Sequence, residues 1–167
     1  MEKLTLKKAG AKILMMAFLF ISTAFAEVAA TKQGASKMKI KIQITSQSGS
    51  HSLTAELLDN PSATAFYQLI KKETPTITLT EYGSFEKVGS LGTSLPRSDR
   101  QVKTSAGDIM LYQGNQITIF YGRNSWSYTP LGKVISASSS TSATIDQAEL
   151  KKILGKGNVT AIFSVDE

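Results

Sequence analysis

The stretch "GDIMLYQGNQITIFYG", residues 107–122, decides the fold because it holds the densest hydrophobic alternation in the chain. In its first half Ile109 and Leu111 fall on one face of an extended strand, and the second half alternates in the same way. A Gly-Asn pair lies between the two halves and is a turn-forming pair. The stretch therefore predicts a β-hairpin with strands over residues 108–112 and 116–121.

Aromatic and polar side chains are interleaved with this hairpin and follow it closely. Arg123, Trp126 and Tyr128 lie just after the second strand, where a cation and aromatic rings can present a stacking surface. Two interpretations of Trp126 stay open, since it could stack on a ligand or plug one end of a barrel. The candidate ligand-binding residues of a groove at this hairpin are Tyr112, Gln113, Gln116, Thr118, Phe120, Arg123 and Trp126.

Residues 1–26 have the pattern of a secretory signal peptide. Four lysines precede the apolar run "ILMMAFLFISTAFA", which ends in small residues. The run is short and interrupted by Ser and Thr, which disfavours a stable membrane span. We expect cleavage before Glu27, export to the periplasm or the medium, and no stable membrane insertion afterwards. An uncleaved N-terminal anchor is the other interpretation.

The composition argues against cysteine-based sites and against nucleic-acid binding. The chain has no cysteine, so it has no disulfide, no thiolate metal site and no cysteine to carry a lipid. Without residues 1–26 the formal charge falls from +6 to +3, with 15 Lys and Arg against 12 Asp and Glu. The positive charge is scattered, whereas a nucleic-acid surface needs a dense basic face. We expect no nucleic-acid partner.

The remaining chain reads as a flexible lead-in, residues 27–37, and one domain, residues 38–167. Its order is strand-strand-helix, several strands, helix, strand, without repeated βαβ units. This order favours a mostly β fold, a small closed and mainly antiparallel β-barrel with two capping helices. Besides the hairpin, strands are expected over residues 38–45, 51–57, 74–82, 85–91, 131–137 and 158–165. Helices are expected over residues 61–72 and 146–155. A long loop-rich segment is expected over residues 83–106, and a turn or exposed loop over residues 122–130.

Local signals mark both helices. Asp59 or Asn60 can cap the first helix, and Pro61 sits where its missing N–H has no cost. Asp146 and Glu149 form a capping-box pattern before the second helix.

Four stretches in this order resemble the cyclophilin fold, and more closely the small bacterial cyclophilin-like barrel proteins, whose function is largely uncharacterised. They are "AELLDNPSATAFYQLI", "GDIMLYQ", "NQITIFYG" and "LGKV", and the likeness spans roughly residues 38–165. Recurrent motifs of the small family resemble four places in this sequence: Asp59-Asn60-Pro61, Gly107-Asp108-Ile109 and Leu131-Gly132, which lie within these stretches, and Glu86-Lys87, which lies between the first two.

The resemblance implies a groove for peptides, since cyclophilins catalyse peptidyl-prolyl cis/trans isomerisation. That reaction needs an apolar pocket and donors that favour the twisted amide. Gln116 resembles the groove glutamine of the family and Trp126 its pocket tryptophan. However, residues 76–89 contain no arginine, Ile117 and Thr118 replace an expected aromatic residue, and no late histidine follows.

Other chemistry-bearing residues favour structural roles. His51 is the single histidine, and a metal site needs several converging ligands, so we expect no metal and no cofactor. Asp59 and Asp108 sit at a helix cap and a strand entrance. Glu86 with Lys87 reads either as an exposed loop pair or as groove lining.

The sequence thus predicts an exported, monomeric cyclophilin-like domain. Its most favoured role is binding a proline-containing peptide, a protein segment or a small ligand in a barrel-side groove without efficient catalysis. A prolyl isomerase that assists folding in the cell envelope, with Arg97 or Arg123 as the donor, is one alternative. An accessory or structural envelope protein that docks on a larger partner is the other.

Overall fold

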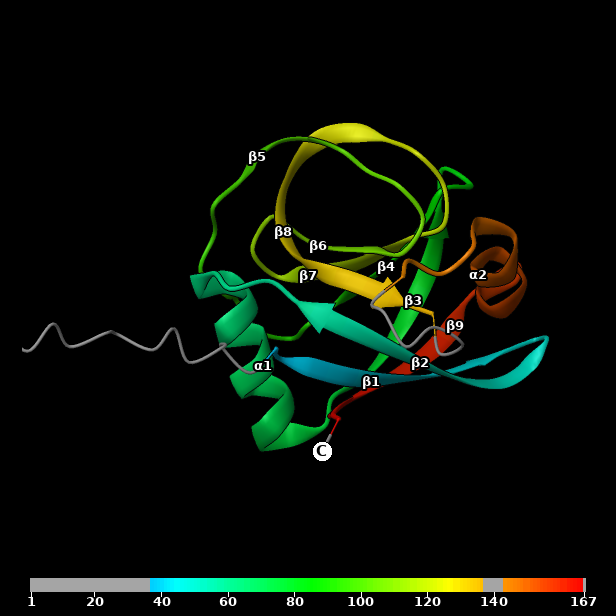
Figure 1. Cartoon of the computed structure of the whole chain (residues 1–167), viewed down its shortest axis with the longest axis horizontal. Helices are drawn as coiled ribbons and strands as arrows, with labels where there is room; N and C mark the ends of the chain where they lie inside the picture. The colour runs from blue at the N-terminus through cyan, green and yellow to red at the C-terminus, as the bar shows by residue number, and fades with distance from the viewer. Residues whose placement is uncertain (1–36, 137–142, 167) are drawn as a thin grey trace, which may run out of the picture. The chain divides into compact units, whose positions relative to one another are not determined.

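The computed structural model describes residues 37–136 and 143–166. The expected signal peptide and all of the lead-in except its last residue lie outside these residues, so both stay predictions. The described part forms nine strands and two helices, labelled in Figure 1. They are β1 (Lys39–Ser46), β2 (Gly49–Leu57), α1 (Pro61–Glu73), β3 (Thr76–Tyr82), β4 (Glu86–Ser90), β5 (Arg100–Lys103), β6 (Asp108–Tyr112), β7 (Gln116–Phe120), β8 (Ser125–Ile135), α2 (Gln147–Leu154) and β9 (Val159–Val165).

The strands form a sheet that closes on itself. The order β2-β1-β9-β3-β4-β7-β6-β8 is completed by the pairing of β2 with β8, and the strand pairs are antiparallel. The last strand in the order, β5, pairs with the first part of β8 outside this ring. The predicted fold class, a small, closed and mainly antiparallel barrel with two helices, is confirmed.

The main core fills the ring because the strands alternate as the sequence predicts. In β1 the side chains of Ile40, Ile42 and Ile44 are fully buried, whereas the intervening residues are exposed. The same period-two burial recurs in β9, where Phe163 is fully buried. These strands are therefore buried on one face only, as the walls of a small barrel are.

The two helices pack on this core at opposite sides of the ring, as Figure 1 shows. Phe66 of α1 contacts the ring of Phe163 edge-on, with centroids 5.6 Å apart. Leu150 and Leu154 of α2 are fully buried in the same core. None of the helices in the described residues is long and apolar enough to cross a membrane.

The sequence prediction was wrong in one region. Residues 122–130 were expected as a turn or exposed loop, but β8 begins at Ser125 and pairs with β5, with Trp126 opposite Val102. The strand β5 itself was not predicted within the long loop-rich segment. The two paired segments, residues 100–103 and 125–128, have no strong local strand pattern. Their backbone groups are paired with each other, across a long separation in sequence, so local patterns do not predict them.

The cap of α1 gives a stability test. The side chain of Asn60 accepts a hydrogen bond from the Ala63 N–H at 2.8 Å, and its amide donates to the Pro130 carbonyl at 3.0 Å. Asn60→Ala should therefore lower the free energy of unfolding by about 1–2 kcal/mol in urea denaturation. The control Asp59→Ala removes an exposed side chain and should change it by less than about 0.5 kcal/mol. Equal losses in the two variants would contradict the assignment of Asn60 as the cap.

Candidate functional site

A cavity of about 630 Å³ lies between the β3–β4 hairpin, the β6–β7 hairpin and the first part of β8. The hydrophobic cluster beside it is separate from the main core of the barrel and is centred on Met110, Phe120 and Tyr128. In Figure 1 the first part of β8 and β5 arch over β6 and β7. The cavity therefore lies on the outer side of the barrel wall, next to the hairpin that decides the fold.

Five aromatic side chains line this cavity: Tyr82, Phe85, Tyr112, Trp126 and Tyr128. Tyr82 contacts Phe85 edge-on at 5.9 Å between ring centroids, and Tyr112 lies 5.8 Å from Tyr128. Phe120 is fully buried beside them, stacked on Phe85 at 6.3 Å and edge-on to Tyr128 at 5.3 Å. Phe120 thus fixes rings that come from opposite sides of the cavity.

Glu86, the first residue of β4, is the charged residue in the lining. Its side chain is only 5% exposed, and its Oε2 atom has no hydrogen-bond partner among the described residues. Burial raises the pKa of Glu86 to about 7. The hydrogen bond with the Tyr128 side chain lowers this pKa, but by less than burial raises it. The cavity therefore contains a buried carboxyl group whose charge state changes near neutral pH.

The polar groups around this carboxyl are amides and a phenol. Gln116 and Asn124 also line the cavity, and the Asn124 side-chain amide donates to the Tyr128 hydroxyl at 2.9 Å. Burial, and secondarily the charge of Glu86, raises the pKa of Tyr128 to about 12. Tyr128 is thus a neutral donor at physiological pH.

Lys87, the neighbour of Glu86, is fully buried but has different partners. Its ammonium lies 3.2 Å from Glu81, bonds to the Gly157 carbonyl and lies 5.9 Å from the ring centroid of Tyr121. The hydrogen bond from Lys87 is the main cause that lowers the pKa of Glu81. The exposed-pair interpretation of Glu86 and Lys87 was wrong, and Lys87 neutralises Glu81.

Three of the seven predicted binding residues, Tyr112, Gln116 and Trp126, line the cavity together. Trp126 is 57% exposed, so its interpretation as a plug of the barrel end was wrong. Phe120 lies behind the aromatic lining, as described above.

The other three predicted residues are not in the lining. Gln113 occupies the turn with φ 52° and donates to the Tyr112 hydroxyl at 3.2 Å. Thr118 is buried in the sheet and donates to the Met110 carbonyl at 3.4 Å. Arg123 is exposed.

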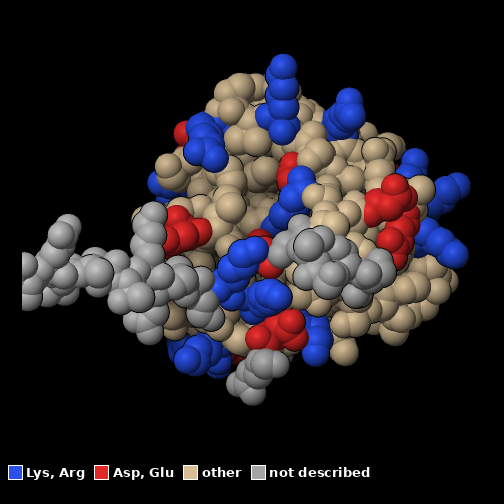
Figure 2. All heavy atoms as spheres, viewed as in Figure 1, with Lys and Arg blue, Asp and Glu red and all other residues tan. Residues whose placement is uncertain are grey.

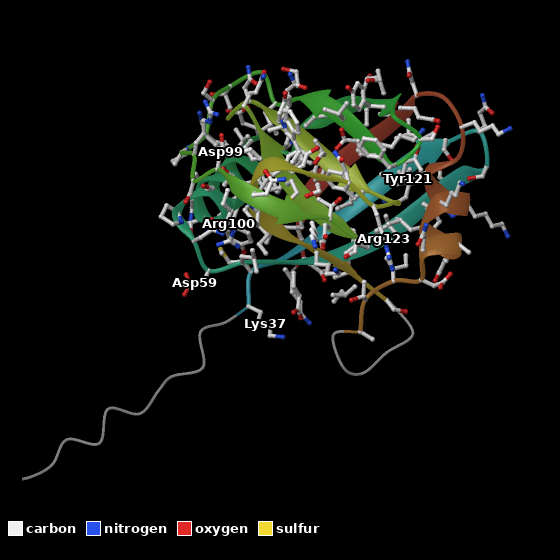
Figure 3. All side chains as sticks on the ribbon, turned by 90° about the horizontal axis from the view of Figure 1, so that it is seen from above. Lys37, Asp59, Asp99, Arg100, Tyr121 and Arg123 are labelled. Atoms are coloured by element: carbon white, nitrogen blue, oxygen red, sulfur yellow. The ribbon has the colours of Figure 1, made fainter. Side chains whose placement is uncertain are left out.

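The remaining candidates have structural contacts. Asp108 accepts from the Ser105 N–H and from the Lys133 ammonium, both at 2.7 Å. Asp59 is exposed and points outward in Figure 3. His51 lies 3.1 Å from the Ser48 hydroxyl. Over residues 37–136 and 143–166 no cluster of His, Asp and Glu could hold a metal ion.

Basic residues do not gather at the cavity. Figure 2 shows lysines and arginines distributed across the visible face with acidic residues among them. Arg97, named above as a possible donor of an isomerase, pairs with Asp99. Within residues 37–136 and 143–166, neither Lys nor Arg lines the cavity.

Sequence reasoning missed Tyr82, Phe85 and Asn124. A signal was present for the first two, because they flank a Gly-Ser pair at which two strands meet, so both rings lie at one end of the β3–β4 hairpin. Asn124 carries no comparable signal, since its position depends on the Thr104 hydroxyl, which accepts its N–H at 2.9 Å from 20 residues away.

The raised pKa of Glu86 predicts a pH-dependent stability. The folded protein keeps this proton up to about pH 7, whereas the unfolded chain loses it near 4.5, so the free energy of unfolding falls as the pH rises through this window. Relative to the native protein, Glu86→Gln should gain about 2–3 kcal/mol between pH 5 and pH 8 in urea denaturation. The exposed control Glu73→Gln should show no such gain. A pH-independent difference for Glu86→Gln would contradict the burial effect.

Comparison with known proteins agrees with this architecture. The model of a cyclophilin-like family matches residues 46–163. The solution structure of the hypothetical protein AF2241 from Archaeoglobus fulgidus is similar, with a TM-score of 0.51 and 13% sequence identity, over 77% of this chain and 98% of that one. At this identity the likeness shows the fold alone. A search of curated proteins found no match. The chain belongs to the cyclophilin-like family.

Proposed function

We propose that this protein is an exported binding module that holds a peptide segment or a small ligand in the cavity beside Tyr112 and Trp126, without efficient catalysis. The observation that carries the proposal is the aromatic-lined cavity of about 630 Å³ on the outer side of the barrel. Export is supported by the lysine-rich start and apolar run of residues 1–26.

The size and lining of the cavity support binding. Pockets for small ligands span roughly 300–1,000 Å³ and combine apolar walls with a few polar groups that orient the ligand. Here the aromatic rings supply the walls, and Glu86, Gln116 and Asn124 supply the polar groups. A ligand of about the size of a short peptide segment could therefore be both enclosed and oriented.

The exposed aromatic rings at the cavity also support binding. Tyr82 and Trp126 are 62% and 57% exposed, and both belong to the lining. Aromatic side chains gain much from burial and keep little conformational freedom, which makes them effective contact residues. A bound ligand that covered these two rings would remove that apolar area from water.

The arrangement supports binding more than isomerisation. Stabilising a twisted prolyl amide calls for donors directed at it, and a guanidinium is the donor in cyclophilins. Arg97 pairs with Asp99 through its Nε, 3.0 Å from the carboxylate, and Arg123 is exposed. Because neither arginine lines the cavity, the groups that remain for the ligand are the amides, the phenols and Glu86.

Binding is tested by NMR titration of the purified protein with proline-containing peptides and a library of small fragments. We expect chemical-shift changes that cluster on Tyr112, Gln116 and the Trp126 indole, because these residues share the cavity. Trp126→Ala should weaken such binding about tenfold, since it removes an exposed aromatic wall. Ser127→Ala, on the adjacent exposed position of β8, is the control. Shifts that never involve the cavity would contradict the proposal.

Catalysis is tested by a protease-coupled isomerisation assay with prolyl peptides. We expect the rate to stay within about twofold of the uncatalysed rate, because neither arginine lines the cavity to lower the amide barrier of about 20 kcal/mol. Arg123→Ala should leave this rate unchanged. A rate enhancement of a hundredfold or more would contradict binding without turnover and favour an isomerase.

A further inference from the structure

The cavity contains an ionisable carboxyl group, which is negatively charged above about pH 7, and this limits what it can bind. Glu86 is the acidic residue of the lining, and among the described residues no Lys or Arg lines the cavity to balance it. We propose that the cavity binds an organic ammonium cation, preferably a methylated one, held between the Glu86 carboxylate and the surrounding aromatic rings. This inference rests on the binding function proposed above and adds the chemical class of the ligand.

Glu86 itself indicates a missing partner. Its Oε2 atom is buried and has no hydrogen-bond partner among the described residues, although buried polar atoms in proteins are nearly always paired. A buried carboxylate with an unpaired oxygen atom is costly, and a cation in contact with it offsets that cost. A neutral apolar ligand would leave the cost in place, and an anion would increase it.

The neighbouring lysine does not supply that cation. Lys87 follows Glu86 in β4, but successive strand residues point to opposite faces, and its ammonium lies 3.2 Å from Glu81. The Glu86 charge is therefore available to a ligand rather than used within β4.

The aromatic rings suit the same ligand. Rings attract cations through their negatively polarised faces, and cages of several rings are a known solution for quaternary ammonium groups. Five aromatic residues line one cavity here, contributed by the β3–β4 hairpin, β6 and β8. Ring contacts with Phe120 or with one another hold four of them in place before a ligand arrives, namely Tyr82, Phe85, Tyr112 and Tyr128. Trp126 is 57% exposed.

The proper condition for a test is pH 8. The pKa of Glu86 is about 7, so at pH 8 its carboxyl is mostly ionised in the empty cavity. The other titratable groups of the lining are the phenols of Tyr82, Tyr112 and Tyr128. A bound cation would favour the ionised carboxyl further.

The test compares two probes of the same shape. Choline carries a trimethylammonium group, and 3,3-dimethyl-1-butanol has the same outline without the charge. Binding of each to the full chain at pH 8 is measured by isothermal titration calorimetry and by the fluorescence of Trp126, the single tryptophan of the chain. We expect choline to bind at least about tenfold more tightly, a difference of about 1.4 kcal/mol. Equal or tighter binding of the neutral probe overturns the inference.

A charge-removing variant tests the role of Glu86. Glu86→Gln keeps the side-chain shape and should bring choline affinity down to that of the neutral probe, which should itself change by less than twofold. Glu73→Gln makes the same chemical change at an exposed site and should leave both affinities unchanged. Thermal unfolding checks that the variants fold. If a variant does not fold, the comparison of the two probes on the native protein still tests the inference. Unchanged choline affinity in Glu86→Gln overturns the inference.

The two proposals can fail separately. If peptides or neutral fragments bind in the cavity and choline and tetramethylammonium do not, the ammonium inference is overturned while the binding function stands. If no probe of any charge affects the cavity, both are overturned.

Discussion

The pairing of β2 with the second half of β8 closes the ring of strands, and the rest of the structure depends on it. Val134 lies opposite Ala55, and Gly132 opposite Leu57. The backbones approach so closely at Gly132 that a Cβ atom there would lie 2.4 Å from the Glu56 carbonyl oxygen. Glycine is therefore required at this position by the space available. Closure also leaves the first half of β8 free to diverge from the ring and pair with β5.

This divergence creates the cavity. The register between β6 and β8 shifts between Ile109 and Met110, so that Ile109 faces Gly132 but Met110 faces Pro130. Such an irregularity bends a strand and increases its twist. Beyond it, Tyr128 and Trp126 extend over β6 and β7 to become lining residues. One strand thus serves both as barrel wall and as one side of the cavity.

The two faces of β4 show how one strand can bury opposite charges independently. Lys87 reaches Glu81 and a backbone carbonyl, so its charge is compensated within the fold. Glu86 faces the aromatic cluster, and its Oε2 atom has no hydrogen-bond partner in the part of the chain that the structure describes. A buried carboxyl group with an unpaired oxygen atom lowers the stability of the fold. Because proteins are only marginally stable, other contacts must offset this loss. The cyclophilin-like barrel therefore carries a cavity that combines aromatic walls with one buried carboxyl group.

The sequence by itself determined the parts that local rules specify. The hairpin over residues 107–122, the alternation of β1 and the Asn60-Pro61 start of α1 each carry their own signal, because strand period, turn pairs and helix caps act over a few residues. The sequence also identified three lining residues, because they lie in the hairpin or a few residues after it: Tyr112, Gln116 and Trp126. Only the tertiary structure decided the pairing of β5 with β8, the burial of Glu86 and its separation from Lys87. These features depend on contacts between segments distant in sequence, and burial, which sets the pKa of Glu86, exists only once those segments meet.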